Sequence, residues 1–260
     1  MSVRGARPAD APEGLGPPAL LRVDEALPGV AQITLCRPRR GNAFSREMVA
    51  AIRQGFDRAL GLSDCHTVVF RSESVDFSTG FDVGGLDQET DESLRERFRD
   101  IEALLAAVYT APCRTVALAK GRTWGAAADL VVSCDERWTI GEAEFRFPGA
   151  RFGLVLGSRR LAGRIGRDRA RQVLFSGQAL GTAAAMSDGL IHRVFQSEAD
   201  ALAALGQAPA LVRETLSRVW AATLAGEGDF LSGDRQALES SMTGALKQRL
   251  LDYVQAQQSG

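Results

Sequence analysis

Two short segments of the chain carry residues suited to chemistry on a negatively charged group. Each combines the end of an apolar strand with glycine: the first is Phe77–Asp82 and the second is Gly121–Asp129. The small side chains at 125–128 allow a ligand to approach the backbone, and free N–H groups at a helix start stabilise negative charge. The pattern predicts that main-chain amides hold an anion, although a Gly-Ala-Ala-Ala run is also typical of a close helix contact.

The motifs of the commoner nucleotide, zinc and hydrolase sites are missing from the sequence. There is no G-x-x-x-x-G-K-[ST], and no G-x-G-x-x-G between a strand and a helix. The only histidines, His66 and His192, leave little room for a zinc site or a Ser-His-Asp mechanism. The 4 cysteines are too widely spaced for a CxxC metal pair. We therefore expect no metal, no nucleotide cofactor and reduced cysteines.

The elements that must position these segments follow from the hydropathy pattern. Alternating residues around a Pro28-Gly29 turn predict a β-hairpin over 21–36. Apolar residues at four-residue steps after Ser45 predict an amphipathic helix with a serine N-cap. Thr67–Phe70 and Arg114–Ala119 are short and continuously apolar, which is typical of strands covered on both faces. A helix between two such strands indicates a parallel α/β sheet.

The second half of the chain changes character. Gly125–Val132 is predicted to be a short, tightly packed helix, and Arg137–Ile140 a further strand. From about residue 158 the pattern is helical to the C-terminus, with no linker rich enough in Pro, Gly or Ser to separate two domains. The fold class predicted from the residues is α/β, with repeated ββα turns and then a C-terminal helical segment.

Several motifs in order carry a resemblance to a known family. From about Leu20 onward, the chain resembles the enoyl-CoA hydratase/isomerase, or crotonase, superfamily. The family patterns are R-P-x-x-x-N-A-L, F-S-A-G-x-D, N-G-x-x-x-G-G-G-x-E…C-D, G-x-x-R-A, L-T-G and G-L-V. They are matched in turn by Arg37–Phe44, Phe77–Asp82, Lys120–Asp135, Gly166–Ala170, Leu174–Gly177 and Gly189–Ile191.

The resemblance implies a crotonase-like spiral of ββα turns that assembles as a homotrimer or a dimer of trimers. It also implies that an acyl-CoA thioester is the substrate, so that coenzyme A enters as part of the substrate and no separate cofactor is needed. Carried over by position, the N–H groups of Phe81 and Ala126 form an oxyanion hole for the thioester oxygen. The positions expected to contact acyl-CoA are Arg39, Gly41, Thr79, Gly80, Asp82, Trp124, Gly125 and Pro148.

Asp129 occupies the position of the first catalytic glutamate of the hydratases. It follows Ala126 by three residues, so on a helix it lies near the same face, where a carboxylate can reach the α-carbon of a thioester. An ordinary first-turn acid that complements the helix dipole is the structural alternative. Asp129 is the expected acid/base, with a side chain one methylene shorter than the glutamate of the family.

The position of the second catalytic glutamate departs from the family. Pro148 is followed by Gly149, which cannot transfer a proton, and the segment Gly153–Arg160 is a few residues shorter than its counterpart in the family. Hydration by two carboxylates is therefore not supported. Single-base isomerisation or decarboxylation fits better, and a non-catalytic acyl-CoA-binding homologue is the alternative.

Composition limits the partners and the compartment. The net charge is −1 over 260 residues, which favours neither nucleic acid nor a membrane surface, and no apolar run reaches the roughly 18 residues of a membrane span. We expect a cytoplasmic protein with a flexible arm at 1–19, a ββα core at 20–195 and a helical trimerisation segment at 196–260. The 6 arginines within 159–171 are expected to serve subunit salt bridges or the phosphates of CoA.

Overall fold

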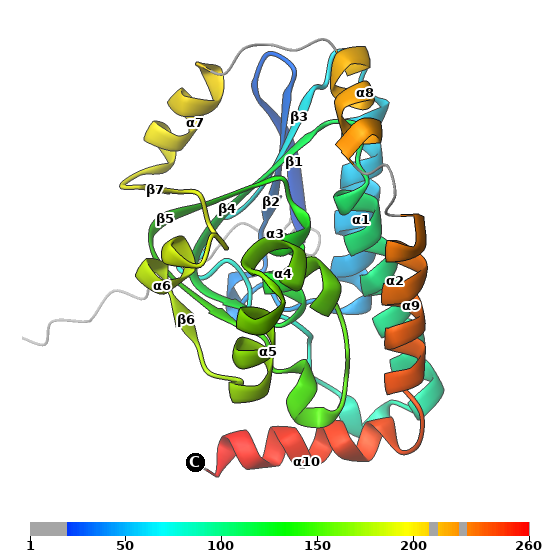
Figure 1. Ribbon diagram of the computed structural model, residues 1–260. Coiled ribbons are helices and arrows are strands. Elements are labelled where there is room, and N and C mark those ends of the chain that lie inside the picture. The colour runs from blue at the N-terminus through cyan, green and yellow to red at the C-terminus, as the bar shows by residue number, and fades with distance from the viewer. Residues whose placement is uncertain (1–19, 208–212, 224–227, 260) are drawn as a thin grey trace, which may run out of the picture.

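A computed structural model describes residues 20–207, 213–223 and 228–259, so the predicted arm at 1–19 lies outside the described residues. The described strands form one 7-stranded sheet in the order β1-β2-β3-β4-β5-β6, with β7 paired to β5 (Figure 1). β1 and β6 pair antiparallel with β2 and β5, and the other pairs are parallel. The strands are β1 Leu21–Leu27, β2 Val30–Leu35, β3 Thr67–Ser72, β4 Arg114–Trp124, β5 Glu136–Arg146, β6 Leu180–Gly181 and β7 Arg193–Phe195.

Helices connect the parallel strands and continue to the end of the described chain. The α-helices are α1 Arg46–Gly61, α2 Asp91–Tyr109, α3 Ala126–Ser133, α4 Ser158–Ile165, α5 Arg167–Ser176, α6 Thr182–Ser187, α7 Glu198–Gly206, α8 Arg213–Thr223, α9 Gly228–Ser241 and α10 Leu246–Gln258. Three short 3₁₀ helices lie between them at Pro38–Arg40, Leu86–Gln88 and Gly149–Phe152. The predicted N-cap of α1 is confirmed, because the Ser45 side chain accepts a hydrogen bond from the Met48 N–H.

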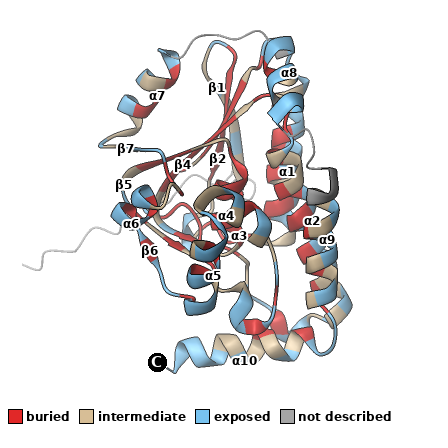
Figure 2. Ribbon diagram, viewed as in Figure 1, coloured by how far each residue is buried: buried red, intermediate tan, exposed pale blue. Residues whose placement is uncertain are grey.

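Both faces of the sheet are covered, as the continuously apolar strands predicted. In β3, Val68 and Phe70 face the large core beneath the connecting helices, whereas Val69 faces a smaller core with Trp138 and Leu205. Alternate residues of a strand point to opposite faces, so each strand must be apolar on both. Figure 2 shows the buried residues concentrated in the strands and on the helix faces that meet them. Helix α7 covers the smaller core.

The observed elements correct the sequence prediction in two places. β4 and β5 extend to Trp124 and Arg146, well beyond the predicted ends at Ala119 and Ile140, because glycines 121 and 141 have positive φ and the strands continue past them. The region after residue 158 is not entirely helical, since β6 and β7 add to β5 there. The extension of β4 matters for function because it carries the chain to Trp124, directly before α3.

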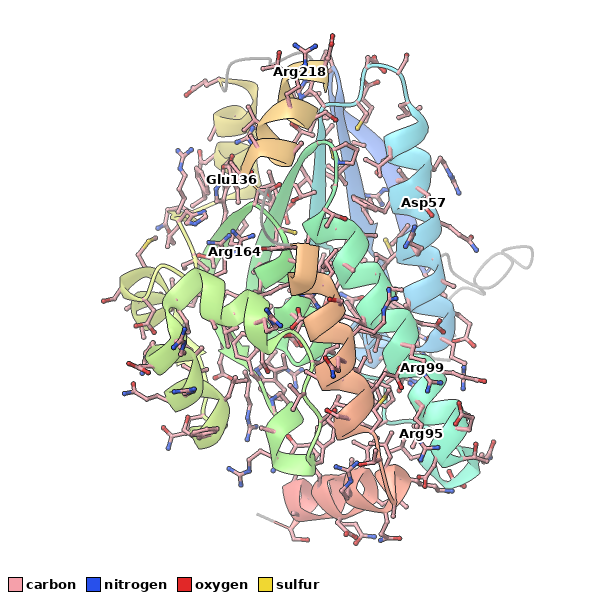
Figure 3. The ribbon with its side chains drawn as sticks, turned by 45° about the vertical axis from the view of Figure 1, so that its right-hand side comes forward. Asp57, Arg95, Arg99, Glu136, Arg164 and Arg218 are labelled. Carbon is pink, nitrogen blue, oxygen red and sulfur yellow. The ribbon has the colours of Figure 1, made fainter. Side chains whose placement is uncertain are left out.

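Helices α9 and α10 close the molecule on the side of α2 (Figure 3). The Arg99 guanidinium on α2 pairs with the Glu239 carboxylate on α9 at 2.8 Å. Arg95, one turn earlier, donates to the carbonyl oxygens of Met242 at 3.0 Å and Gly244 at 3.3 Å, between α9 and α10. No helix among the described residues is long and apolar enough to cross a membrane. The four cysteines are free thiols, three of them buried.

Candidate active site

The two glycine-containing segments lie side by side at the carboxyl end of β4. The Ser78 N–H donates to the Arg122 carbonyl at 3.1 Å, and the Trp124 N–H donates back to the Ser78 carbonyl at 3.0 Å. A Cβ atom at Gly80, whose φ is +83°, would lie 2.3 Å from the Trp124 carbonyl oxygen. The contact between the segments therefore requires glycine at position 80.

The amides expected to form the oxyanion hole lie on these two segments. Ala126 is the first residue of α3, so its N–H has no acceptor within the helix. On the other segment, the Asp82 N–H donates to the Phe44 carbonyl at 3.2 Å, and the Gly80 carbonyl accepts from the Phe44 N–H at 2.7 Å. Phe81 lies between them, and within the described chain neither its N–H nor that of Ala126 donates to a protein acceptor. Both amides remain available to a ligand.

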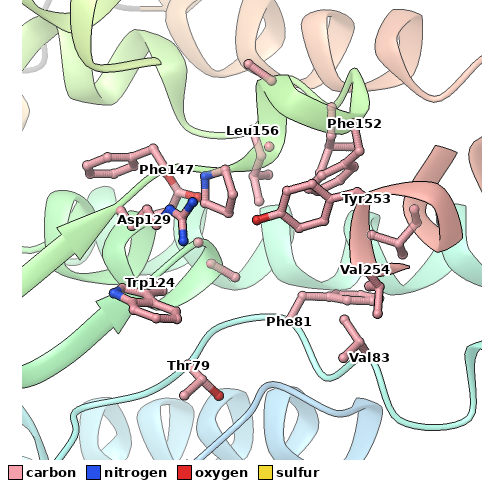
Figure 4. A pocket seen from close by; sticks show the side chains of 18 of the residues that line it. Thr79, Phe81, Val83, Trp124, Asp129, Phe147, Phe152, Leu156, Tyr253 and Val254 are labelled. Atoms are coloured by element: carbon pink, nitrogen blue, oxygen red, sulfur yellow. The ribbon is translucent and has the colours of Figure 1, made fainter. Parts of the chain in front are cut away.

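A cavity of about 850 Å³ opens beside these amides, lined by both Phe81 and Ala126 (Figure 4). Its wall is mainly apolar and comes from seven parts of the chain, including α10. Sequence reasoning missed most of that wall, because no local pattern shows which loop or helix face turns towards a ligand. The missed lining residues include Val83, Phe98, Phe147, Phe152, Leu154, Leu156, Ser158, Leu174 and Val254.

Most of the predicted site residues line this cavity. They are Thr79, Phe81, Asp82, Trp124, Gly125, Ala126, Asp129 and Pro148. Gly41 and Gly80 support the lining from behind, since the Gly41 carbonyl accepts from the Thr79 N–H at 2.9 Å. Arg39 is exposed and does not line the cavity; the neighbouring Arg40 does. The prediction for Arg39 is therefore corrected to Arg40, because the 3₁₀ turn at Pro38–Arg40 directs successive side chains to different sides.

Asp129 is the deepest acid of the cavity wall. It is 6% exposed, and its carboxyl group makes no hydrogen bond with the described residues. A Cβ atom at Gly157 would lie 2.4 Å from Asp129 Oδ1, so the carboxyl group packs directly against the Gly157 backbone. Burial raises the pKa of Asp129 well above its usual value; the Arg160 charge lowers it, and the charges of Glu102 and Asp234 raise it further. A raised pKa suits a group that both accepts and donates a proton near neutral pH.

Asp82 has a different role from Asp129 although it lines the same cavity. Its Oδ2 pairs with the Arg37 guanidinium at 2.8 Å, and its Oδ1 accepts from the Gly84 N–H at 2.9 Å. Both carboxylate oxygens are engaged in holding the loop that presents Phe81. Asp82 therefore supports this loop and is not a free base.

Trp124 is fixed by its neighbours. Its indole Nε1–H donates to Glu144 Oε1 at 2.9 Å, and the guanidinium groups of Arg122 and Arg146 lie 5.4 and 5.7 Å from the ring centre. Glu142 is exposed, whereas Glu144 is half-buried and engaged with the indole. Glu144 therefore positions a cavity wall and is not a free acid.

Among the described residues, Asp129 is the one carboxyl group of the cavity wall that is not engaged with another residue. The lining acids among the described residues are Asp82 and Asp129, and Gly149 occupies the wall next to Pro148. No group of three potential metal ligands occurs among the residues that the structure describes. The arrangement can stabilise an oxyanion and exchange one proton through one carboxyl group.

Comparison with known proteins identifies the family. The sequence model of the enoyl-CoA hydratase/isomerase family matches residues 25–223. The chain belongs to the enoyl-CoA hydratase/isomerase family. The resemblance inferred from the ordered motifs is thereby confirmed.

Individual members of the family are moderately similar to this chain in sequence. A Danio rerio protein named enoyl-CoA hydratase domain-containing protein 3, mitochondrial, is 28% identical over 186 residues, which cover 70% of this chain and 64% of that protein. A Mycobacterium tuberculosis protein named probable enoyl-CoA hydratase echA6 is 30% identical over 169 residues, covering 64% of this chain and 67% of that one. The match thus spans about two thirds of the length of these family members.

Solved structures confirm the crotonase-like α/β fold of this family member. An enoyl-CoA hydratase/isomerase family protein from Bordetella parapertussis superposes with a TM-score of 0.80 and 34% identity, covering 90% of this chain and 98% of that one. The enoyl-CoA hydratase from Bacillus halodurans, at 19% identity, shares the fold with a TM-score of 0.76 over 90% of this chain and 100% of its own.

Proposed function

We propose that the protein binds an acyl-CoA thioester and stabilises its enolate between the N–H groups of Phe81 and Ala126. The observation that carries this proposal is the pair of unengaged amides beside a largely apolar cavity with one buried carboxyl group. Removing a proton or a carboxylate next to a thioester places negative charge on the carbonyl oxygen. One main-chain donor to such an oxyanion contributes about 3–4 kcal/mol in enzymes where it has been removed.

Asp129 is the acid/base of the proposed reaction. It takes a proton from the α-carbon of a β,γ-unsaturated thioester and returns it to the γ-carbon of the resulting dienolate, so that the double bond moves to the α,β position. Double-bond isomerisation or decarboxylation needs no second carboxylate, whereas addition of water by the two-glutamate route does. The absence of a second unengaged acid among the described lining residues therefore favours isomerase or decarboxylase chemistry over hydration.

The coenzyme A portion of the substrate requires positive charge at the cavity entrance. Arg40, Arg122, Arg146 and Arg171 line the cavity, and Arg171 is exposed. We propose that these arginines meet the phosphate groups of CoA, because guanidinium groups bind phosphate oxygens in pairs. The self-association as a homotrimer or dimer of trimers, and the cytoplasmic location, stay predictions.

Proton exchange at the α-carbon tests the catalytic proposal. Wild-type protein and the Asp129→Asn variant are incubated with saturated and unsaturated acyl-CoA thioesters in deuterium oxide, and deuterium uptake is followed by mass spectrometry. Wild type should incorporate deuterium, and Asp129→Asn should lose at least about a hundredfold of the rate, the lower end of a general base's contribution. Asp57→Asn on the exposed face of α1 is the matched control and should keep the wild-type rate.

The same assay separates the enzyme from the non-catalytic alternative. A calorimetric titration with CoA and acyl-CoA measures binding independently of exchange. Tight binding of acyl-CoA with no exchange on any thioester would identify a binding protein. Exchange that is equally fast in Asp129→Asn would refute the role of Asp129.

A further inference from the structure

A buried ionic cluster lies behind Asp129, formed by Glu102 on α2, Arg160 on α4 and Asp234 on α9. The Arg160 side chain is fully buried, and its Nη1 lies 3.1 Å from Glu102 Oε1 and 3.2 Å from Asp234 Oδ2. Sequence analysis expected the arginines at 159–171 to serve subunit contacts or CoA phosphates. For Arg160 that expectation is wrong, because its guanidinium is enclosed by acids from two other helices of its own chain.

The cluster and Asp129 are joined through the first turn of α4. Gly157 directly precedes that helix and packs against the Asp129 carboxyl group, and Arg160 lies in its first turn. The charged groups that act on Asp129 are those of Arg160, Glu102 and Asp234. Among the described residues of β4 and β5, which also pack on α3, none adds a charge to this set. Arg159 acts on Asp234 in turn.

The cluster has more acids than it can neutralise. Three carboxyl groups surround the guanidinium of Arg160, and Arg159 also acts on Asp234, so full ionisation would still leave net negative charge in a dry part of the core. Isolated charges in such surroundings are strongly disfavoured, and a carboxyl group relieves the repulsion by keeping its proton. Glu102 and Asp234 contact Arg160 directly, whereas Asp129 has no hydrogen-bond partner among the described residues. Burial raises the pKa of both Asp129 and Asp234, and Asp129, which forms no ion pair with Arg160, is the member expected to keep its proton most readily.

We propose that Glu102, Arg160 and Asp234 are positioning residues that control the proton occupancy of Asp129. This inference rests on the proposed function for its catalytic meaning, but the proton occupancy itself is a property of the resting protein. An aspartate with an ordinary proton affinity is a weak base at neutral pH. The negative charges of Glu102 and Asp234 make Asp129 a stronger base. Arg160 limits that effect and holds the two acids in place.

Direct titration of Asp129 tests the inference without any substrate. Protein labelled with carbon-13 at aspartate carboxyl groups is titrated by NMR, and the Asp129 signal is assigned by its absence in Asp129→Asn. In Glu102→Gln, the midpoint of the Asp129 titration should fall by about one pH unit or more, a tenfold weaker hold on the proton, because a neighbouring negative charge is removed. Asp234→Asn should shift the midpoint in the same direction.

Two further variants make the test specific. Arg160→Gln removes the positive charge and should raise the midpoint, opposite to the acid variants. Glu239→Gln removes a carboxylate from the same helix as Asp234, but Glu239 pairs with the exposed Arg99, so the midpoint should stay unchanged. If Glu102→Gln fails to fold, Asp234→Asn replaces it in the test, because Asp234 lies further from Arg160 than Glu102 does and its loss should disturb the fold less.

The outcomes separate this inference from the proposed function. If deuterium exchange occurs, the acid limb of its pH profile should move with the NMR midpoint in each variant. Shifted midpoints in a protein that exchanges no thioester would support the cluster and reject the catalytic role. Folded Asp234→Asn or Glu102→Gln protein with the wild-type midpoint would overturn the inference, because the cluster would then be purely structural.

Discussion

Replacing Gly80 by alanine tests whether the two amide-bearing segments must touch. The added Cβ would lie 2.3 Å from the Trp124 carbonyl oxygen and 3.4 Å from Gly125 Cα. The first of these contacts is with backbone, so no side-chain rotation can relieve it. One of the two segments must therefore move, and the Ala126 N–H moves with the Trp124 segment relative to the Phe81 N–H.

The size of the effect follows from the geometry. Restoring an ordinary contact of 3.4 Å requires a displacement of about one ångström at the Trp124 carbonyl. A misplacement of that size lowers catalytic rates by about a hundredfold, similar to the loss of one oxyanion-hole donor. The φ of +83° at Gly80 adds about 1–2 kcal/mol of backbone strain to the loss of stability.

Gly85→Ala provides the matched control for this substitution. Its φ of +73° imposes similar backbone strain, but an added Cβ there has no neighbouring atom within 4 Å. Gly85→Ala should lose stability from backbone strain alone and Gly80→Ala should lose more because of its clash, while only Gly80→Ala should lose about a hundredfold in the rate of α-proton exchange. Equal exchange rates in the two folded variants would refute the idea that the contact between the segments builds the oxyanion hole.

Further substitutions test the carboxyl group and the cavity wall. Gly157→Ala should slow exchange at least about tenfold, because its Cβ would lie 2.4 Å from Asp129 Oδ1, whereas Gly163→Ala points into open space and should leave the rate unchanged. In thermal unfolding from pH 5 to pH 9, Asp129→Asn should become progressively more stable relative to wild type. The pKa of Asp129 is raised in the folded protein, so the contribution of Asp129 to the free energy of unfolding is complete below pH 4. Above that pH the contribution falls by about 1.4 kcal/mol per pH unit until the folded-state pKa is passed. A stability difference between Asp129→Asn and wild type that does not change with pH would contradict this. Glu144→Ala releases the indole of Trp124 and should raise KM for acyl-CoA several-fold at unchanged kcat, and an unchanged KM would show that the wall does not need this hydrogen bond.

The sequence was sufficient to predict strands β1 to β5, although not β6 and β7, because each of those five carries its own hydropathy pattern. A run such as Thr67–Phe70 is apolar on both faces, and both faces are in fact covered by separate cores. The serine before α1 likewise marks a helix start by a local hydrogen bond. Strand ends were less predictable, because the glycines at 121 and 141 resemble breaks, yet the backbone continues through them with positive φ.

The site was predictable only where its chemistry lies in the backbone. Phe81 and Ala126 were predicted from the small residues beside them and from the ordered motifs, and both line the cavity. Tyr253 lines the same cavity from α10, and no local pattern links that helix to α3. The contact between Glu102 and Arg160 joins residues 58 positions apart, and either residue alone resembles an ordinary charged helix position. Contacts of this kind are set by helix packing, which sequence periodicity does not specify.

The short acid and the short loop of this family member belong together. The segment Gly153–Arg160 is a few residues shorter than the family pattern, and it ends with Gly157 packed on the Asp129 carboxyl group. A glutamate at position 129 would extend one methylene further, towards backbone that already lies at contact distance. An aspartate beside a glycine therefore fits the space that the shorter loop leaves. The shorter loop also passes close enough for Arg160, in the next helical turn, to act on the same carboxyl group. An aspartate at position 129 and a glycine at position 157 thus fit each other around a single carboxyl group.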